Sequence, residues 1–271
     1  MVDFDAIDDC IPRVWCNESS STKIKAVQSR SIFMSRSSSD KAPAILIIGA
    51  SRGLGHAMAA ELLNQGWSVV GTTRPLEGRT QLHDLADESQ GRLQVETVDI
   101  CEPEQIAALR AHLSGRVFDI LFVNAGVANA NPNDTIAEVS TEEFIRVMVT
   151  NALGPMRSVE ALQDLVPPDG LIGVMSSGQG SIASNTSGGF EVYRGSKSAL
   201  NQYMRSYAAR HAGGPRALVL MAPGWIRTAL GGPHAPFGLE ETIPDIVNTL
   251  LSKRGRPGLE YLDRMGRTVP W

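Results

Sequence analysis

The chain has little cysteine, few aromatic residues and no strong excess of charge. Its 271 residues include three cysteines, Cys10, Cys16 and Cys101, an odd number without the spacing of zinc ligands. We therefore expect a reducing, cytoplasmic location and no metal site. The formal net charge is −4 and there is no basic run, which gives no reason to expect nucleic acid as a partner. No apolar run approaches the roughly 20 residues of a membrane helix, so we expect no membrane partner either.

Residues 1–40 differ in composition from the rest of the chain. They contain serine clusters at 19–21 and 35–39 and show no sustained periodicity, which predicts a disordered N-terminal tail. The segment has no hydrophobic region of the kind found in a secretory signal, and its acidic residues disfavour a mitochondrial presequence. We expect this tail to be dispensable, with Met34 as a candidate internal start and residues 41–271 as one catalytic domain.

From residue 44 onward, short apolar runs alternate with amphipathic segments. Strands are expected at 44–48, 68–72, 93–98, 117–123, 171–175, 217–221 and 260–262. Helices are expected at 57–63, 79–89, 104–113, 141–165, 193–210 and 240–252, with a bend at Gly154-Pro155 in the longest. This alternation predicts a single-domain α/β Rossmann fold, in which helices cover both faces of a doubly wound parallel sheet of about seven strands.

A glycine-rich turn joins the first expected strand to the first helix. Its sequence is Gly49-Ala50-Ser51-Arg52-Gly53-Leu54-Gly55. Glycines let the backbone approach a pyrophosphate, and the helix N-terminus offers free N–H groups and the positive end of the helix dipole. The alternative is a plain strand-to-helix turn. The position of three glycines between a buried strand and a helix favours dinucleotide binding.

Polar and small residues also follow the other expected strands. They are Asp99, Asn124-Ala125-Gly126, Ser177 and Pro223-Gly224. The carboxyl ends of parallel strands meet at one edge of the sheet, where ligands of this fold class bind. We therefore expect these residues and the glycine turn to form one site.

Tyr193 and Lys197 stand four residues apart in an expected helix. This spacing places both side chains on one helix face. A nearby ammonium lowers the pKa of a phenol, which makes the pair suited to proton transfer in a carbonyl/alcohol couple. The alternative is an amphipathic tyrosine packed beside a solvated lysine.

Together these motifs resemble the short-chain dehydrogenase/reductase family over residues 43–271. Within that family the chain is most similar to the branch of C-factor and Sniffer-type carbonyl reductases. The resemblance depends on motifs that occur in the family's order, namely Gly49-x-x-x-Gly53-x-Gly55, Asn124-Ala125-Gly126, Asn151, Ser176-Ser177-Gly178-Gln179-Gly180, Tyr193-x-x-x-Lys197, Pro223-Gly224-Trp225-Ile226-Arg227-Thr228 and Pro270-Trp271.

The resemblance implies a role for each polar residue of the site. Tyr193 is the expected acid/base, and Lys197 lowers its pKa and binds the nicotinamide ribose. Ser177 polarises the substrate carbonyl, although the neighbouring Ser176 is an alternative. Asn151 is expected to hold a water behind Lys197. Without the resemblance, Ser177 also suits a turn cap and Asn151 a helix irregularity.

The same resemblance predicts a set of cofactor contacts along the carboxyl edge of the sheet. These are Gly49, Ser51, Arg52, Gly53, Leu54, Gly55, Arg74, Asp99, Ile100, Asn124, Ala125, Gly126, Tyr193, Lys197, Pro223, Gly224, Trp225, Ile226 and Thr228. After the second strand the chain carries Arg74 where NAD-dependent members place an acid, and Arg52 adds a second cation. Two guanidinium groups suit a 2′-phosphate, so we expect NADP(H) to be preferred over NAD(H). The alternative is two solvated surface arginines.

The substrate and the assembly are less clearly marked. Residues 225–238 are rich in glycine and proline and carry Trp225, Leu230 and Phe237, as a lid over an apolar pocket or an ordinary surface loop would. We expect a small apolar carbonyl or alcohol substrate and a homodimer or homotetramer. Two other functions stay open, a dinucleotide-binding regulatory protein with little catalysis and an epimerase or dehydratase of the same fold.

Overall fold

The structure, a computed structural model, describes residues 42–75 and 79–271 of the chain. The predicted tail at 1–40 lies outside these residues. A seven-stranded, entirely parallel sheet forms the centre of the domain, in the order β3-β2-β1-β4-β5-β6-β7. The strands are β1 (Ala44–Ile48), β2 (Ser68–Thr73), β3 (Leu93–Thr97), β4 (Ile120–Val123), β5 (Leu171–Met175), β6 (Ala217–Ala222) and β7 (Gly258–Asp263). The order reverses between β1 and β4, which confirms the predicted doubly wound α/β Rossmann fold.

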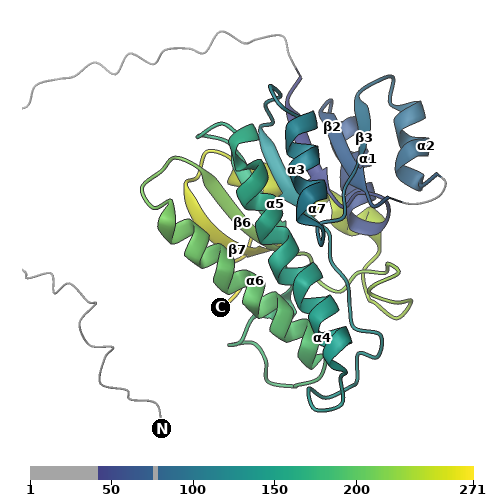
Figure 1. The fold of residues 1–271 in the computed structure, drawn as a ribbon, viewed down its shortest axis with the longest axis vertical. Helices are drawn as coiled ribbons and strands as arrows, with labels where there is room; N and C mark the ends of the chain where they lie inside the picture. The colour runs from purple at the N-terminus through teal and green to yellow at the C-terminus, as the bar shows by residue number, and fades with distance from the viewer. Residues whose placement is uncertain (1–41, 76–78) are drawn as a thin grey trace, which may run out of the picture. The chain divides into compact units, whose positions relative to one another are not determined.

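Helices cover both faces of the sheet (Figure 1). They are α1 (Gly53–Asn64), α2 (Gln81–Glu88), α3 (Pro103–His112), α4 (Thr141–Met148), α5 (Gly154–Leu162), α6 (Glu191–Arg210) and α7 (Leu239–Lys253). One apolar core packs α3, α5 and α6 against the sheet, and a second packs α1, α2 and α7 against the other face. No helix of residues 42–75 or 79–271 is long and apolar enough to cross a membrane.

The strands are buried because both sides of each central strand face a helix layer. In β1, Leu46 and Ile48 enter one core while Ile45 and Ile47 enter the other. Alternate side chains of a strand point to opposite faces, so a strand between two layers needs apolar residues at every position. This explains the unbroken apolar run at the start of the domain.

The long helix expected at 141–165 is divided into shorter helical segments. Between α4 and α5 lies a π-helical turn, Val149–Leu153, and α5 is followed by a 3₁₀ turn, Gln163–Leu165. Gly154-Pro155 therefore follows the irregularity instead of causing a simple bend. Gly154 itself is required for packing, because a Cβ there would lie 2.8 Å from the carbonyl oxygen of Ile100.

Candidate functional site

The glycine turn after β1 is held by contacts from two neighbouring strands. The backbone N–H of Gly49 donates to Thr72 Oγ1 at 2.9 Å, and Asn124 Nδ2 donates to the Gly49 carbonyl at 2.7 Å. Gly49 has a φ of +88°, in the left-handed region that favours glycine. A Cβ on Gly55 would lie 2.2 Å from the Gly49 carbonyl oxygen. The turn therefore requires these glycines for close backbone packing, and the Asn124 side chain links it to the segment after β4.

The turn leaves the N-terminus of α1 open toward an anion. Arg52 is the N-cap residue, yet its side chain makes no capping hydrogen bond, and the first turn of α1 carries no acidic residue. The first N–H groups of a helix lack intrahelical partners and attract negative charge. A Cβ on Gly53 would lie 3.8 Å from Thr228 of the segment after β6, so that segment borders the turn. This arrangement fits the pyrophosphate of a dinucleotide.

The two arginines predicted to distinguish the cofactors are exposed near this turn. Arg52 precedes α1, and Arg74 follows the last residue of β2. Neither guanidinium group forms a hydrogen bond or ion pair within the described part of the chain. Across the end of β3, Asp99 accepts a hydrogen bond from the Cys101 N–H at 2.9 Å, and the adjacent Ile100 is buried. Both cations are thus free to meet a phosphate.

Tyr193 and Ser177 lie together where α6 passes the carboxyl end of β5. A side-chain hydrogen bond joins their hydroxyl groups. Ser177 Oγ also accepts from the Gln179 N–H at 3.2 Å, as the turn-capping alternative predicts. Ser176 is only 2% exposed, and its Oγ donates to Asn201 Oδ1 at 2.6 Å. Of the two serines, the geometry therefore favours Ser177 as the one that faces the tyrosine.

Lys197 is buried below the tyrosine. Its Nζ donates to the carbonyl of Met175 at 3.0 Å and lies 5.9 Å from the centre of the Tyr193 ring. Burial lowers the pKa of Lys197 to about 8, because an ammonium loses hydration there. Burial also raises the pKa of the Tyr193 phenol, and the hydrogen bond with Ser177 offsets only part of this rise. Desolvation is the largest influence on this phenol in the structure, and the role of Lys197 in lowering its pKa stays a prediction.

Asn151 lies in the π-helical turn, completely buried. Its Oδ1 accepts from the Val127 N–H at 2.8 Å, and its Nδ2 donates to the Val127 carbonyl at 2.8 Å and to Ser196 Oγ at 2.9 Å. A Cβ on Gly126 would lie 3.3 Å from Asn151 Oδ1 and 3.4 Å from Lys197 Nζ. Asn151 thus joins the segment after β4 to α6 beside Lys197, as the interpretation of a polar residue at a helix irregularity predicts.

The segment after β6 is folded onto itself. Ile226 forms a β-bridge with Phe237, and Trp225 Nε1 donates to the Gly231 carbonyl at 2.7 Å. Arg227 Nη1 donates to the carbonyls of Ala235 and Pro236 at 2.9 and 2.8 Å. Pro223 and Gly224 open this segment at the end of β6, where Gly224 adopts a φ of +95°. Trp225 and Leu230 stay more than half exposed, so their apolar side chains remain available for contacts.

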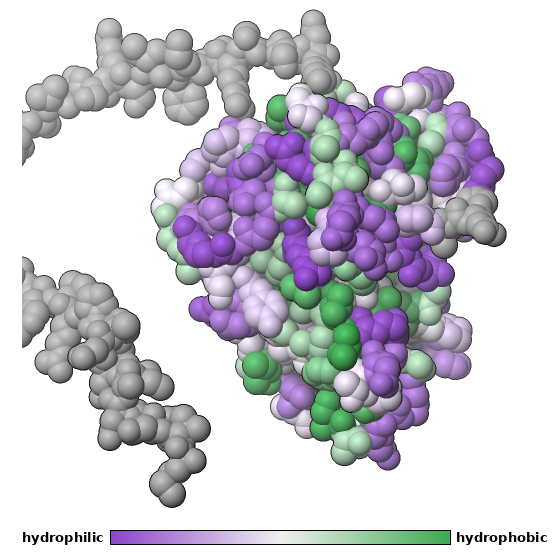
Figure 2. Space-filling view, viewed as in Figure 1, coloured by the Kyte–Doolittle hydropathy of each residue, from purple (hydrophilic) through white to green (hydrophobic). Residues whose placement is uncertain are grey.

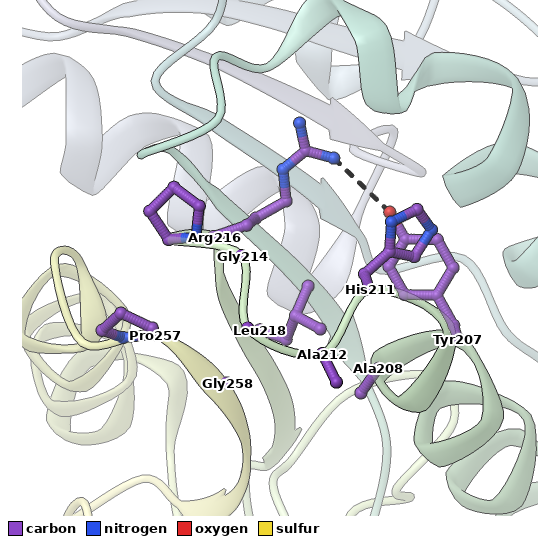
Figure 3. Close-up of a pocket in the computed structure, with 11 residues that line it drawn as sticks. Tyr207, Ala208, His211, Ala212, Gly214, Arg216, Leu218, Pro257 and Gly258 are labelled. Carbon is purple, nitrogen blue, oxygen red and sulfur yellow. Dashed lines mark hydrogen bonds between the residues drawn. The ribbon is translucent and has the colours of Figure 1, made fainter.

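A hollow of about 440 Å³ lies at the opposite end of the molecule. Figure 3 shows it between the end of α6 and the starts of β6 and β7, with Tyr207 and Arg216 joined by a hydrogen bond. Because it borders the amino ends of the strands, it does not belong to the site built around Tyr193.

Two supporting residues were missed from the sequence. Thr72 holds the glycine turn, and the backbone of Val127 holds Asn151. The role of Thr72 could have been predicted, because it is a small polar residue at the end of an apolar strand. The role of Val127 could not, because it acts through its backbone and any residue type offers the same groups.

Comparison with known proteins places this geometry among oxidoreductases. A family model described as short chain dehydrogenase matches residues 43–236. A crystal structure from Burkholderia multivorans, assigned to the short-chain dehydrogenases/reductases and holding bound NADP, is 65% identical, has a TM-score of 0.84, and covers 85% of this chain and 100% of its own. The 1-hydroxy-2-glutathionyl-2-methyl-3-butene dehydrogenase of Rhodococcus sp. strain AD45 is 31% identical over 213 residues, 76% of this chain and 89% of that protein.

Two further proteins test the finer resemblance suggested by the motifs. The C-signal protein of Myxococcus xanthus is 31% identical over 155 residues, 56% of this chain and 92% of that protein. The carbonyl reductase Sniffer of D. melanogaster is 28% identical, with a TM-score of 0.76 over 85% of this chain and 100% of its own. The expected resemblance to this branch is confirmed.

Proposed function

The chain belongs to the short-chain dehydrogenase/reductase family and is an oxidoreductase, and we propose that it transfers a hydride between NADP(H) and a small apolar carbonyl or secondary alcohol. The observation that carries this proposal is the meeting of Tyr193, Ser177 and Lys197 at the carboxyl edge of the sheet. The glycine turn at the same edge supports a dinucleotide there.

Cofactor binding is assigned to the loops at this edge. The proposed contacts are Gly49, Ser51, Arg52, Gly53, Leu54, Gly55, Arg74, Asp99, Ile100, Asn124, Ala125, Gly126, Tyr193, Lys197, Pro223, Gly224, Trp225, Ile226 and Thr228. The bound nicotinamide cofactor supplies or accepts the hydride, and the protein orients it. The open N-terminus of α1 supports a pyrophosphate at the glycine turn.

The proton is moved by Tyr193. In reduction its hydroxyl donates a proton to the substrate oxygen, and in oxidation the phenolate accepts one. Ser177 donates a hydrogen bond to the same oxygen, which polarises the carbonyl. Lys197 supplies a positive charge beneath the phenol, and Asn151 fixes the backbone next to it. The raised pKa of Tyr193 favours the protonated form that reduction requires.

The preference for NADP(H) is supported by charge. Arg52 and Arg74 are exposed near the glycine turn, and β2 ends without an acidic residue. An acid there would repel a 2′-phosphate, whereas guanidinium groups bind one with charge-assisted hydrogen bonds. The 65% identical structure from Burkholderia multivorans holds NADP, in agreement with this proposal.

The apolar character of the substrate is supported by the loops that border the site. Large apolar side chains are exposed after β4 at Ile136, after β5 at Ile182 and Phe190, and after β6 at Trp225 and Leu230. Exposed apolar residues on several loops of one sheet edge are typical of a binding site. The alternative interpretation of the last loop as plain surface leaves these side chains without a role.

The experiment is a panel of aldehydes and ketones, apolar and charged, tested with NADPH and NADH by cofactor absorbance. We expect apolar carbonyls to be reduced with NADPH. Turnover of charged carbonyls alone would contradict the apolar substrate. No turnover of any carbonyl or alcohol would favour the regulatory alternative.

We also propose a homodimer or homotetramer in the cytoplasm. Exposed apolar side chains occur on the side of the molecule formed by α4, the π-helical turn and α6, namely Phe144, Ile145, Leu153 and Tyr203. Figure 2 shows hydrophobic surface gathered over α4 and α5 on this face. Sedimentation of the wild type and of Ile145→Glu tests the assembly, and cell fractionation tests the location. A wild-type monomer would contradict the proposed oligomer.

A further inference from the structure

A tyrosine of the last strand reaches the backbone of the proposed active-site serine. Tyr261, in β7, is 1% exposed, and its hydroxyl donates to the carbonyl oxygen of Ser177, 84 positions earlier in the chain. The same carbonyl accepts the N–H of Gly180 at 2.8 Å. Both lone pairs of this oxygen are therefore used, which fixes the orientation of the peptide group that follows Ser177.

The surrounding side chains form a buried polar network. Ser176 Oγ donates to Asn201 Oδ1 at 2.6 Å, and Asn201 Nδ2 donates to the Gly180 carbonyl at 3.2 Å. The side chains of Asn201 and Ser176 also lie beside the hydroxyl of Tyr261. Networks whose polar groups are satisfied make a buried region rigid. The residues on either side of Ser177 are thus held to α6, the helix that carries Tyr193.

The C-terminal residues Val269 and Trp271 pack against Tyr261. The rings of Tyr261 and Trp271 lie 5.4 Å apart, and the guanidinium of Arg205 lies 4.5 Å above the Trp271 ring. The Val269 N–H donates to the Tyr261 carbonyl at 2.8 Å. The Trp271 carbonyl accepts from the Ala183 N–H at 2.9 Å, in the segment after Ser177. The C-terminal segment therefore contacts Tyr261 and the loop that follows Ser177.

We propose that Tyr261 is a positioning residue that aims the hydroxyl of Ser177 at Tyr193 and the substrate oxygen. With its carbonyl held by Tyr261 and Gly180, Ser177 keeps an extended backbone with φ −161° and ψ 147°, and only its χ1 rotation stays free. Its Oγ then lies where it meets the Tyr193 hydroxyl. This inference rests on the proposed function, because it assigns Ser177 a direct role in reduction.

Tyr261→Phe removes the hydroxyl and keeps the ring against Trp271. We expect kcat for carbonyl reduction to fall by about tenfold to a hundredfold, because small errors in positioning are costly in catalysis. The KM for NADPH should stay within about twofold, since no proposed cofactor contact is changed. Unchanged kcat in a folded Tyr261→Phe would overturn the proposal.

Tyr207→Phe is the matched control. Tyr207 is equally buried in α6, and its hydroxyl accepts from Arg216 in the hollow of Figure 3 and donates to Gln163 Oε1 at 2.7 Å. Tyr207→Phe therefore removes buried hydrogen bonds of a tyrosine hydroxyl, as Tyr261→Phe does, but at the opposite end of the molecule. We expect a lower melting temperature and wild-type kcat. An equal loss of kcat in both variants would reduce the Tyr261 effect to general destabilisation.

A double-mutant cycle separates positioning from a role independent of Ser177. Once Ser177→Ala has removed the hydroxyl, Tyr261→Phe should lower kcat little further. If the two substitutions instead lower kcat independently, so that the loss in the double mutant is the product of the two single losses, the inference is contradicted. If Tyr261→Phe does not fold, Trp271→Leu takes its place in the cycle, because it weakens the support and retains the hydroxyl. An inactive wild type would refute the proposed function itself, whereas an active wild type with an unaffected Tyr261→Phe refutes only the positioning role.

Discussion

Replacing Lys197 with methionine should make the fold more stable while it abolishes turnover. Lys197 is 3% exposed, and its Nζ contacts the Met175 carbonyl at 3.0 Å. No carboxylate forms an ion pair with it among residues 42–75 and 79–271. Methionine has a similar length and no charge, so the substitution removes a buried cation and leaves the space filled.

The size of the effect follows from the pKa. Burial lowers the pKa of Lys197 from 10.5 to about 8. At ~1.4 kcal/mol per tenfold change, keeping this lysine in the fold costs about 3 kcal/mol at pH 7. Lys197→Met removes this cost, but it also loses the hydrogen bond to the Met175 carbonyl, which lowers the stability of the variant by about 1 kcal/mol. The variant should therefore be more stable than the wild type by about 2 kcal/mol at pH 7.

The difference should depend on pH with a definite sign. The folded pKa lies below the unfolded one, so the unfolded chain binds more protons between about pH 8 and 10.5. Wild-type stability therefore rises with pH across this window, and the cost of burying the lysine falls to about 1 kcal/mol by pH 10. The advantage of Lys197→Met should then be close to zero.

The assay is urea unfolding of both proteins at pH 7 and pH 10 without cofactor, followed by circular dichroism. Lys253→Met is the control, because Lys253 is equally buried but its Nζ lies 2.8 Å from the Glu260 carboxylate, so its removal should destabilise. A Lys197→Met variant less stable than the wild type at pH 7, or a difference that does not change with pH, would refute the reasoning.

Four further substitutions, one of them a control, test the cofactor site. Gly55→Ala should weaken NADPH binding and lower stability by about 1–3 kcal/mol, because its Cβ would lie 2.2 Å from the Gly49 carbonyl oxygen. Gly195→Ala, with no atom within 4 Å of the new Cβ in α6, should instead leave binding unchanged and stabilise by up to about 1 kcal/mol; titration and thermal melting measure both. Arg74→Ala should raise the KM for NADPH at least tenfold and leave that for NADH within about twofold, and Arg52→Ala should act in the same direction. Equal changes for both cofactors would contradict a phosphate contact.

Most of the fold could be predicted from the sequence because apolar runs and turns follow simple periods. The run Ala44–Ile48 is a buried strand, and the glycine turn after it leads into α1. That helix begins at Gly53, earlier than the expected start at residue 57. The carboxyl edge of a parallel sheet then determines which strand-end residues come together.

The parts of the site that could not be predicted depend on long-range contacts. The spacing of Tyr193 and Lys197 predicts a shared helix face, but not that the Lys197 ammonium donates to the Met175 carbonyl on another element. Nor does it show how strongly each group is buried, which decides the direction of the phenol pKa. The contact of Tyr261 with Ser177 joins residues 84 positions apart and has no local pattern.

The most direct test of the proposed function is the kcat of Tyr193→Phe for reduction of an apolar carbonyl with NADPH. This substitution removes one hydroxyl and keeps the ring beside Lys197, so NADPH binding and melting temperature should change little. We expect kcat to fall by about 10²–10⁴-fold, the usual loss when general acid catalysis is removed. Tyr203→Phe, at an exposed position of the same helix, should keep full activity. Near wild-type reduction by Tyr193→Phe would contradict the assignment of the proton donor and the account built on it.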